Sequence, residues 1–399
     1  MKQGWDIIEL GEICETGAGG TPFKAHKEYY EGGTIPWLLS GEVSQGEIFE
    51  ARHFITDKGL KNSSAKLFPP NTVLVAMYGA TAGQVGILKF EACTNQAVCG
   101  ILPNDKTIPE YLFYCFLSKK DELVSQAVGG AQPNISQIKI RNTKILLPPL
   151  PEQQRIVEIL DDTFASIVKA KANAEQNLKN AKELFESYLQ SVFTNMGEGW
   201  EEKTLGEIAT VKGGKRVPKG YRLQTEPTNY PYIRVTDFND NGSIDINDLH
   251  YVSEDIFNQI KNYTISSKDL YISIAGTIGK TGLVPKELEG ANLTENACKL
   301  VFQEGIDPKL IYYFTKSGDF LKQAGINTRV AAMPKLALIR LSTIHFSIPK
   351  SLKQQQTIVQ KLDALSTESQ KLETIYQQKL NDLEELKKSI LQKAFNGEL

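Results

Sequence analysis

The chain has 399 residues, of which 41% are hydrophobic and 23% charged, and its formal net charge at pH 7 is −2. These values fit a globular protein of two or three domains and exclude a wholly disordered chain. The apolar runs are far shorter than the ~20 residues that a membrane span needs, and the first residues lack the apolar core of a signal peptide. We therefore expect a cytoplasmic protein.

Cysteine and histidine usage predicts no metal site. The five cysteines include no Cys-x-x-Cys pair, and the four histidines lie far apart. Scattered cysteines in an odd number are typical of buried thiols in a reducing compartment. Because the net charge is close to zero, the chain as a whole does not attract nucleic acid. A DNA-binding site would have to be a local cluster of cations.

The sequence contains an internal repeat with an offset of 195 to 202 residues. Leu10-Gly-Glu-Ile13 returns as Leu205-Gly-Glu-Ile208, and Ile156-Val157 returns as Ile358-Val359. Further matches lie between these pairs in the same order, as small loop insertions in the second copy would allow. We therefore expect one structural unit written twice.

The first part of each copy mixes strands, turns and short helices. Thr72–Met77 is predicted to be a buried strand, and Asp269–Ala275 alternates as a strand does. Leu112–Leu117 and Leu310–Phe314 are apolar, aromatic-rich runs that fit short helices. This mixture indicates an α+β fold, with two similar mixed α/β domains.

Each copy ends in a long helical segment. Pro148-Pro149-Leu150-Pro151 stops the preceding structure, and Glu152–Phe193 contains no Pro or Gly. Apolar or small residues recur there every three or four positions, as in a coiled coil. The same pattern follows Ser351 and ends at Asn396-Gly397. Each helix would be ~60 Å long and would overhang its own domain, so we expect the two helices to pack on each other.

We expect that pair to be antiparallel rather than parallel, because the second globular domain lies between the helices and must return the chain to the first. The predicted division is a first domain at 1–150, a central helix at 151–195, a second domain at 196–350 and a C-terminal helix at 351–399.

No catalytic motif can be assigned. Gly276-Thr-Ile-Gly-Lys-Thr281 looks like a phosphate loop, but Ile274 occupies the position where that loop requires a glycine. The counterpart in the first copy has Gln84 where a lysine would be needed. A glycine-rich turn between strands is the better interpretation of both segments. Neither Pro-Pro pair has the flanking residues of a DNA amino-methyltransferase motif, and we predict no catalytic residue and no metal ligand.

Local positive charge is the remaining signal. Lys212–Arg222 holds five cations and no acid, with glycines that keep the backbone open. Arginine matches guanine or phosphate, and small residues let backbone amides approach phosphate. Gly19–Lys27 is a weaker counterpart in the first copy, and a merely solvated loop is the alternative for both. The candidate DNA-binding residues are Lys24, Lys27, Lys212, Lys215, Arg216, Lys219, Arg222 and Arg234.

The order and duplication of the motifs resemble the specificity (S) subunits of type I restriction–modification systems, over essentially the whole chain. The strongest motif is Leu147-Pro-Pro-Leu-Pro-Glu-Gln-Gln154, which opens a long helix; the second copy departs from it, with Ser351-Leu-Lys-Gln-Gln-Gln356. The other segments that carry the resemblance are the Trp…Leu-Gly-Glu-Ile openings, Gly19-Gly-Thr-Pro22, Ile35-Pro-Trp37, Gly79-Ala-Thr-Ala-Gly83, Gly276-Thr-Ile-Gly-Lys280 and Thr94-Asn-Gln-Ala97.

The resemblance implies two target-recognition domains, each reading one half of a bipartite double-stranded DNA site. It implies that the helices set the spacing between them and dock two methyltransferase (M) subunits. S-adenosylmethionine, ATP and magnesium would then be bound by M and by restriction/translocase (R) subunits, and this chain would be a non-catalytic subunit. Two alternatives remain: a coiled-coil scaffold that binds only proteins, and an enzyme whose site is unrecognised.

Overall fold

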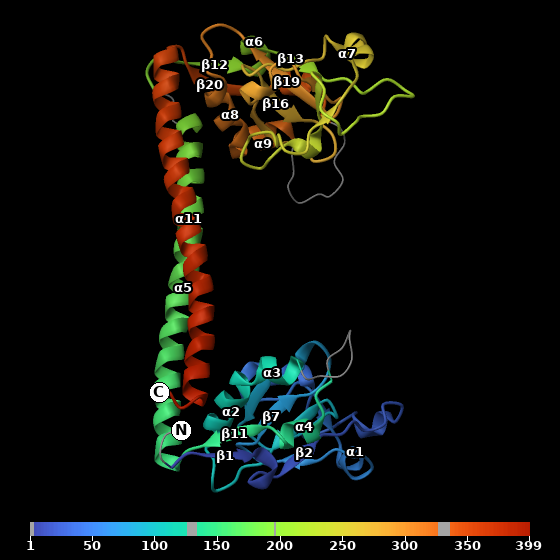
Figure 1. Cartoon of the computed structure of the whole chain (residues 1–399), viewed down its shortest axis with the longest axis vertical. Coiled ribbons are helices and arrows are strands. Elements are labelled where there is room, and N and C mark those ends of the chain that lie inside the picture. Colours follow the sequence, from blue (N-terminus) through green and yellow to red (C-terminus); the bar gives the residue numbers. More distant parts are fainter. Residues whose placement is uncertain (1–3, 126–133, 195–196, 326–335) are drawn as a thin grey trace. The chain divides into compact units, whose positions relative to one another are not determined.

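The computed structural model describes residues 4–125, 134–194, 197–325 and 336–399. The chain forms two compact units, and each combines one globular part with a portion of both long helices (Figure 1). Unit 1 contains Met1–Glu175 and Gln378–Leu399, and unit 2 contains Gln176–Gln377. The domains predicted from the sequence, in contrast, are continuous stretches of the chain. Their bounds stay a prediction.

The globular part of unit 1 is built on two sheets. In the larger sheet neighbouring strands are antiparallel except for the parallel pair at its β4 edge. Its strands are, in spatial order, β2 (Thr16–Ala18), β10 (Val98–Ile101), β7 (Val73–Ala76), β8 (Val85–Leu88) and β4 (Gly46–Ile48). The smaller sheet is β5 (Phe54–Ile55), β3 (Ile35–Leu38), β9 (Ala92–Thr94) and β6 (Leu67–Phe68). Strands β7, β8 and β10 are wholly buried, which explains their continuous apolar runs.

Unit 2 repeats this topology with fewer strands. Its larger sheet is β13 (Ala209–Gly213), β19 (Ala297–Phe302), β16 (Leu270–Ser273) and β17 (Thr281–Leu283). Its smaller sheet is β15 (His250–Tyr251), β14 (Pro231–Ile233) and β18 (Asn292–Leu293). In each unit a further antiparallel pair joins the start of the globular part to its end: β1 (Asp6–Glu9) with β11 (Lys144–Leu147), and β12 (Trp200–Thr204) with β20 (His345–Pro349). The predicted repeat is therefore confirmed.

Short helices cover the sheets in the same order in both units. The helix α2 packs on β7 and β8, and its counterpart α8 packs on β17. Both begin with proline at a first-turn position, where the missing N–H costs nothing. The short helices of unit 1 are α1 (Asp57–Lys61), α2 (Pro109–Ser118), α3 (Lys120–Ser125) and α4 (Gln137–Arg141). Those of unit 2 are α6 (Leu205–Ile208), α7 (Glu254–Ile260), α8 (Pro308–Lys316), α9 (Gly318–Ala324) and α10 (Leu338–Ser342).

The two long helices, α5 (Leu150–Thr194) and α11 (Leu352–Phe395), run antiparallel. In unit 1 Arg155 donates to the carbonyl oxygen of Leu399 (2.9 Å), and the Lys171 amine bonds the Glu384 carboxylate (2.7 Å). In unit 2 the buried hydroxyl of Ser369 donates to the carbonyl oxygen of Ala181 (3.1 Å). Residue numbers rise along α5 as those of their partners, on α11 and just after it, fall, so the predicted antiparallel coiled coil is confirmed.

A buried glutamine in the first turn ties each long helix to its globular part. In α5 the Gln153 side chain accepts from the backbone N–H of Ile108 (2.9 Å) and donates to the carbonyl oxygens of Lys106 and Pro148 (2.9 Å each). In α11 Gln355 forms the same three bonds, with the N–H of Asp307 (2.8 Å) and the carbonyl oxygens of Pro349 (2.9 Å) and Gly305 (3.2 Å). The first glutamine of the Gln-Gln pair in the helix-opening motif thus has a structural role.

All five cysteines are buried and free, as expected from the sequence. Burial raises the pKa of the Cys99 and Cys298 thiols to about 12, so neither is a thiolate near neutral pH. None of the helices in the described ranges is both long and apolar enough to cross a membrane.

Candidate nucleic-acid interface

The basic loop of unit 2 is the segment Lys215–Arg222, which follows β13. The residues at its start are held tightly by the neighbouring backbone. A Cβ added at Gly214 would come within 2.1 Å of the Thr294 carbonyl oxygen, so only glycine fits there. The backbone N–H of Lys215 donates to the carbonyl oxygen of Leu293 (2.8 Å), and the Tyr232 hydroxyl donates to the carbonyl oxygen of Lys215 (2.9 Å). The cations that follow therefore project from a rigid edge of the sheet.

Unit 1 holds its counterpart loop in the same way. A Cβ at Gly19 would come within 2.1 Å of the Thr94 hydroxyl oxygen. The N–H of Gly20 donates to the carbonyl oxygen of Thr94 (2.9 Å), and the Trp37 indole N–H donates to the carbonyl oxygen of Gly20 (2.9 Å). Because Trp37 and Tyr232 are repeat equivalents, the same anchoring contact occurs in both units.

In unit 2 the basic loop borders an open hollow of about 550 Å³. Three of the predicted DNA-binding residues, Arg216, Lys219 and Arg234, line it together with aromatic and amide side chains. Tyr221, Tyr232, Thr294 and Asn296 also line it. Such a set offers charge for phosphate, a flat ring for stacking and an amide for base edges.

One residue that lines this hollow, Arg216, forms an ion pair. The Arg216 guanidinium bonds the Glu295 carboxylate, although the Arg216 side chain is 78% exposed. Partial burial would raise the pKa of the Glu295 carboxyl, but the bond from Arg216, with backbone and Thr294 hydrogen bonds, brings that pKa below its ordinary value. In the free protein Arg216 is therefore partly neutralised.

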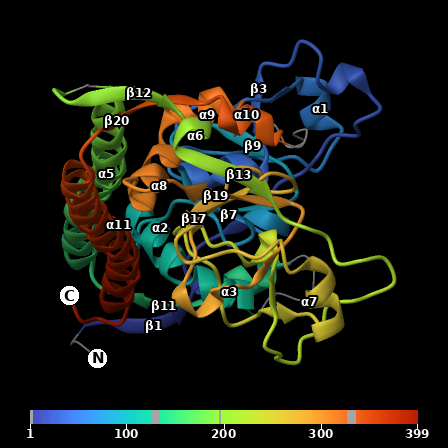
Figure 2. The ribbon, with the colours of Figure 1, turned by 90° about the horizontal axis from the view of Figure 1, so that it is seen from above.

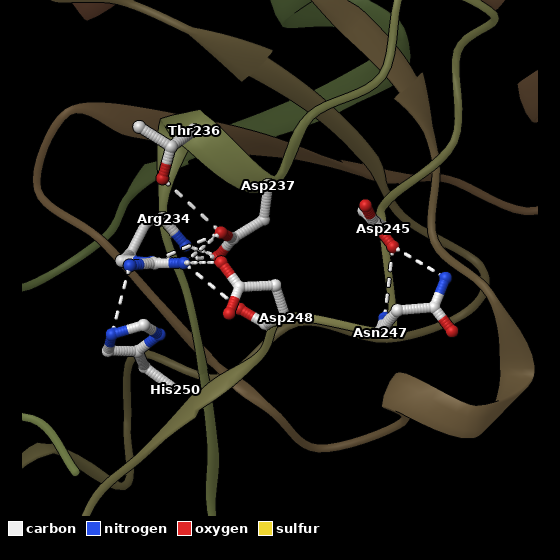
Figure 3. A network of polar contacts seen from close by, with 7 residues as sticks. All are labelled: Arg234, Thr236, Asp237, Asp245, Asn247, Asp248 and His250. Atoms are coloured by element: carbon white, nitrogen blue, oxygen red, sulfur yellow. Dashed lines mark hydrogen bonds and ion pairs between the residues drawn. The ribbon is translucent and has the colours of Figure 1, made fainter. Parts of the chain in front are cut away.

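Arg234 lies at the centre of a polar network (Figure 3). Its Nη2 donates to the nearly buried carboxylate of Asp237 (2.6 Å) and to the carbonyl oxygen of Asp248 (3.0 Å). Its Nη1 lies 3.1 Å from Nε2 of His250. Farther along the same loop, Asp245 accepts hydrogen bonds from the backbone and side chain of Asn247 (Figure 3). These contacts give Arg234 a role in positioning the loop; its contact with DNA stays a prediction.

The remaining predicted residues of unit 2 are more open. Lys212 is exposed on β13 opposite Lys299, and the Lys215 amine lies over the Tyr263 ring, 5.6 Å from its centroid. Lys219 and Arg222 are exposed, and within the described ranges neither has an ion-pair partner. Three of the eight predicted residues, Arg216, Lys219 and Arg234, thus line one hollow. Lys215 and Arg222 are direct sequence neighbours of residues that line it.

The two predicted residues of unit 1, Lys24 and Lys27, are exposed after the Gly19-Gly20 turn. Lys27 begins a short 3-10 helix, Lys27–Tyr29, and the neighbouring Glu28 is paired with Lys58 (2.7 Å).

The sequence did not single out the amides that face these loops. Asn296 lines the hollow of unit 2, and in unit 1 the equivalent Gln96 accepts a hydrogen bond from the Thr21 hydroxyl. Asparagine and glutamine can read adenine edges. These amides could have been found from the repeated Thr-x-x-Ala segments, because each segment has an amide side chain one residue before its alanine.

The glycine-rich segments form turns between strands, as predicted. Gly276 and Gly279 have positive φ angles of 75° and 90° between β16 and β17. The Lys280 amine donates to the carbonyl oxygen of Phe238 (3.0 Å) and pairs with Asp240 (2.8 Å). Lys280 is therefore used within the protein rather than directed into a phosphate loop.

Comparison with known proteins identifies similar sequences along the whole chain. A family model described as the type I restriction modification DNA specificity domain matches residues 2–179 and again 197–384. The type I restriction enzyme MjaIX specificity subunit of Methanocaldococcus jannaschii is 25% identical, over 100% of this chain and 94% of its own length. The EcoR124I/EcoR124II specificity subunit of Escherichia coli is 29% identical over 46% of this chain and 47% of its own.

Two solved structures share the fold. A chain from a study of complex assembly and conformational transition of the type I R-M system superposes with a TM-score of 0.80 at 20% identity, covering 100% of this chain and 99% of that one. The HsdS subunit from Thermoanaerobacter tengcongensis superposes with a TM-score of 0.68 at 19% identity, over 100% and 98%. At such identities the likeness concerns the fold alone.

Proposed function

Because the chain belongs to the type I restriction–modification DNA specificity family and is a specificity subunit with two DNA specificity domains, we propose that each domain reads one half of a bipartite duplex site. In this proposal the hollow beside Arg216 and Lys219 binds one half-site. The Gly19–Lys27 loop, with Lys24 and Lys27, belongs to the surface that binds the other.

The observation that carries the proposal is the duplicated anchoring of the two loops. In each unit a glycine that tolerates no Cβ directly follows an edge strand of the larger sheet, and an aromatic side chain from the smaller sheet holds the next carbonyl oxygen. Two rigid loops of the same construction but different side chains suit two readers of different sequences. A scaffold that binds only proteins would have no use for this arrangement.

The long helices have a separate role in the proposal. They set the distance between the two readers and dock two methyltransferase subunits, one for each copy of the repeat, and restriction/translocase subunits complete the enzyme. Those partners would bring S-adenosylmethionine, ATP and magnesium. Within the described residues, no group of three or more His, Cys, Asp or Glu side chains could hold a metal. In this proposal the chain itself is the non-catalytic reader.

The test is to co-express the chain with its methyltransferase subunits and to sequence the methylated DNA. We expect one motif with two specified halves and an unspecified spacer. Arg216→Ala should relax the half read by unit 2 only, and Lys24→Ala with Lys27→Ala should affect only the other half. A contiguous motif, or methylation that does not require this chain, would overturn the proposal.

The purified chain alone supplies a second test. We expect it to show no methyl transfer, no DNA cleavage and no ATP hydrolysis. Turnover of any of these substrates by the homogeneous chain would support an enzyme with an unrecognised site instead.

A further inference from the structure

We propose that one exposed isoleucine in each globular part, Ile138 in unit 1 and Ile339 in unit 2, contacts the methyl group of a thymine in its half-site. This inference rests on the proposed function and names two residues that determine its specificity. It concerns the short helices α4 and α10, which the sequence analysis did not single out.

Both isoleucines stand out by their exposure. Ile339 is 80% exposed, more than any other large apolar residue in the described part of the chain, and Ile138 is 68% exposed. Two positions further along, Ile140 and Leu341 are completely buried. The helices are thus fixed by these inner residues, and the outer isoleucines add nothing to either core.

The two positions are equivalent in the repeat. Ile138 is the second residue of α4 (Gln137–Arg141), and Ile339 is the second residue of α10 (Leu338–Ser342). A single exposed apolar residue is ordinary on a protein surface. The same exposure at the same place in two domains of different sequence indicates a shared use.

Each isoleucine has an arginine close by in the sequence of its helix. Neither short helix contains an acidic residue. Arg141 is exposed and lies three positions after Ile138, on the same face of α4. Arg340 follows Ile339 directly, and its Nε donates to the carbonyl oxygen of Gln323 (3.1 Å). A protein-docking surface would be a contiguous apolar patch, whereas a single exposed apolar side chain on a short helix with an arginine and no acid suits a duplex.

Each helix also packs on the strand that leads into a candidate DNA-binding loop. In unit 1 the Gln137 side chain donates to the carbonyl oxygen (3.0 Å) and the hydroxyl (2.9 Å) of Thr16 on β2. In unit 2 α10 contacts α6 and β13 (Figure 2). A Cβ at Gly213 would lie 3.4 Å from the Leu338 side chain. The isoleucines and the basic loops therefore lie on neighbouring elements of the same unit.

The chemistry of the duplex identifies the contact. In the major groove the thymine C5-methyl is an apolar group on an otherwise polar edge, and apolar side chains recognise it. The cations near each isoleucine would contact phosphate, which positions the helix without reading sequence. Each half-site should therefore contain a thymine whose methyl group matters.

The experiment uses the complex with methyltransferase subunits and duplexes that carry its methylated motif. Each thymine of a half-site is replaced in turn by uracil, which lacks only the methyl group. At one position per half-site uracil should weaken binding by about fourfold, the value of one buried methyl group. Ile339→Ala should weaken binding to the thymine duplex by a similar factor and remove the uracil effect at the unit 2 position only. Ile138→Ala should do so for the other half-site.

Two controls separate base contact from other causes. Ile246→Ala in unit 2 and Ile7→Ala in unit 1 make the same substitution at exposed residues, 49% and 55% exposed, and should change nothing. The salt dependence of binding should not change in any variant, because no charge is lost.

If Ile138→Ala and Ile339→Ala keep the uracil effect at every position, this inference alone is overturned. It is also overturned if these variants no longer bind the methyltransferase subunits, because the isoleucines would then contact protein. A wild-type complex with no preference for its own motif would overturn the proposed function as well.

Discussion

Replacing the buried glutamine of either long helix should loosen the junction between that helix and its domain. We choose Gln153→Met in α5 and Gln355→Met in α11, because methionine keeps the volume of the side chain and removes its hydrogen bonds. The matched controls are Gln154→Met and Gln356→Met, at exposed positions one residue later. The Gln154 side chain donates to Glu158 of its own helix, at 3.1 Å.

The magnitude follows from the bonds that are lost. Gln153 makes three bonds of 2.9 Å to backbone groups, and at ~1 kcal/mol net for each bond the loss is about 3 kcal/mol. Gln355 makes one bond of 3.2 Å among its three, so its loss should be somewhat smaller, at about 2–3 kcal/mol. With a urea dependence of about 2–3 kcal/mol per M, the unfolding midpoint of the affected unit falls by roughly 0.7–1.5 M.

Urea unfolding, combined with amide hydrogen exchange, measures both effects. Gln153→Met should destabilise unit 1 and expose the Ile108 amide to exchange, and Gln355→Met should act on unit 2 and on the Asp307 amide. The control variants should stay within about 0.5 kcal/mol of the original chain. Equal midpoints for Gln153→Met and Gln154→Met, with the Ile108 amide still protected, would refute the reasoning.

Three further predictions concern DNA binding by the assembled complex. Replacing Lys215, Arg216 and Lys219 together by Ala should weaken binding and lower the slope of log K against log salt by about 0.9 for each lost phosphate contact; an unchanged slope would make this a merely solvated loop. Glu295→Gln should release Arg216 and tighten binding, measured by titration at fixed salt. Folding lowers the pKa of Glu295, so its ion pair contributes fully to the stability of the native state at pH values above the pKa of the unfolded chain. This stabilisation is lost as the pH falls through the lowered pKa. The stability of the Gln variant should not depend on pH in this way. One heptad can be added to each long helix at the two points where the chain passes from one unit to the other, which lengthens the coiled coil by ~10 Å. The unspecified spacer between the two halves of the methylated motif should then lengthen by up to about three base pairs. An active complex whose motif keeps the original spacer would show that the helices do not set it.

The sequence predicted the features that depend on periodicity and on local steric limits. The seam of α5 and α11 was visible because apolar residues recur at helical spacing over many turns. Lys171 interrupts that seam, and the structure pairs it with Glu384 across the coiled coil. The glycine turns were predictable because positive φ angles favour glycine wherever they occur.

The details of the candidate site depend on register and could not be predicted. Arg216 meets Glu295, 79 residues away, because β13 and β19 pair in one particular register. Arg234 bonds Asp237 only because a 3-10 turn, Val235–Asp237, folds the chain back. Sequence composition counts these arginines as cations and cannot show which acid each one faces.

These ion pairs bear on how a chain with a net charge of −2 can select a DNA sequence. Arg216 and Arg234 are both held by carboxylates, so a phosphate or base has to compete with an acid already in place. Nonspecific binding draws almost wholly on phosphate attraction, and internal acids weaken that term at every site on DNA. A correct half-site supplies base contacts in addition, which do not depend on net charge. Under the proposed function, partial neutralisation of the arginines therefore lowers affinity for all DNA while it preserves the difference between the right sequence and the wrong one.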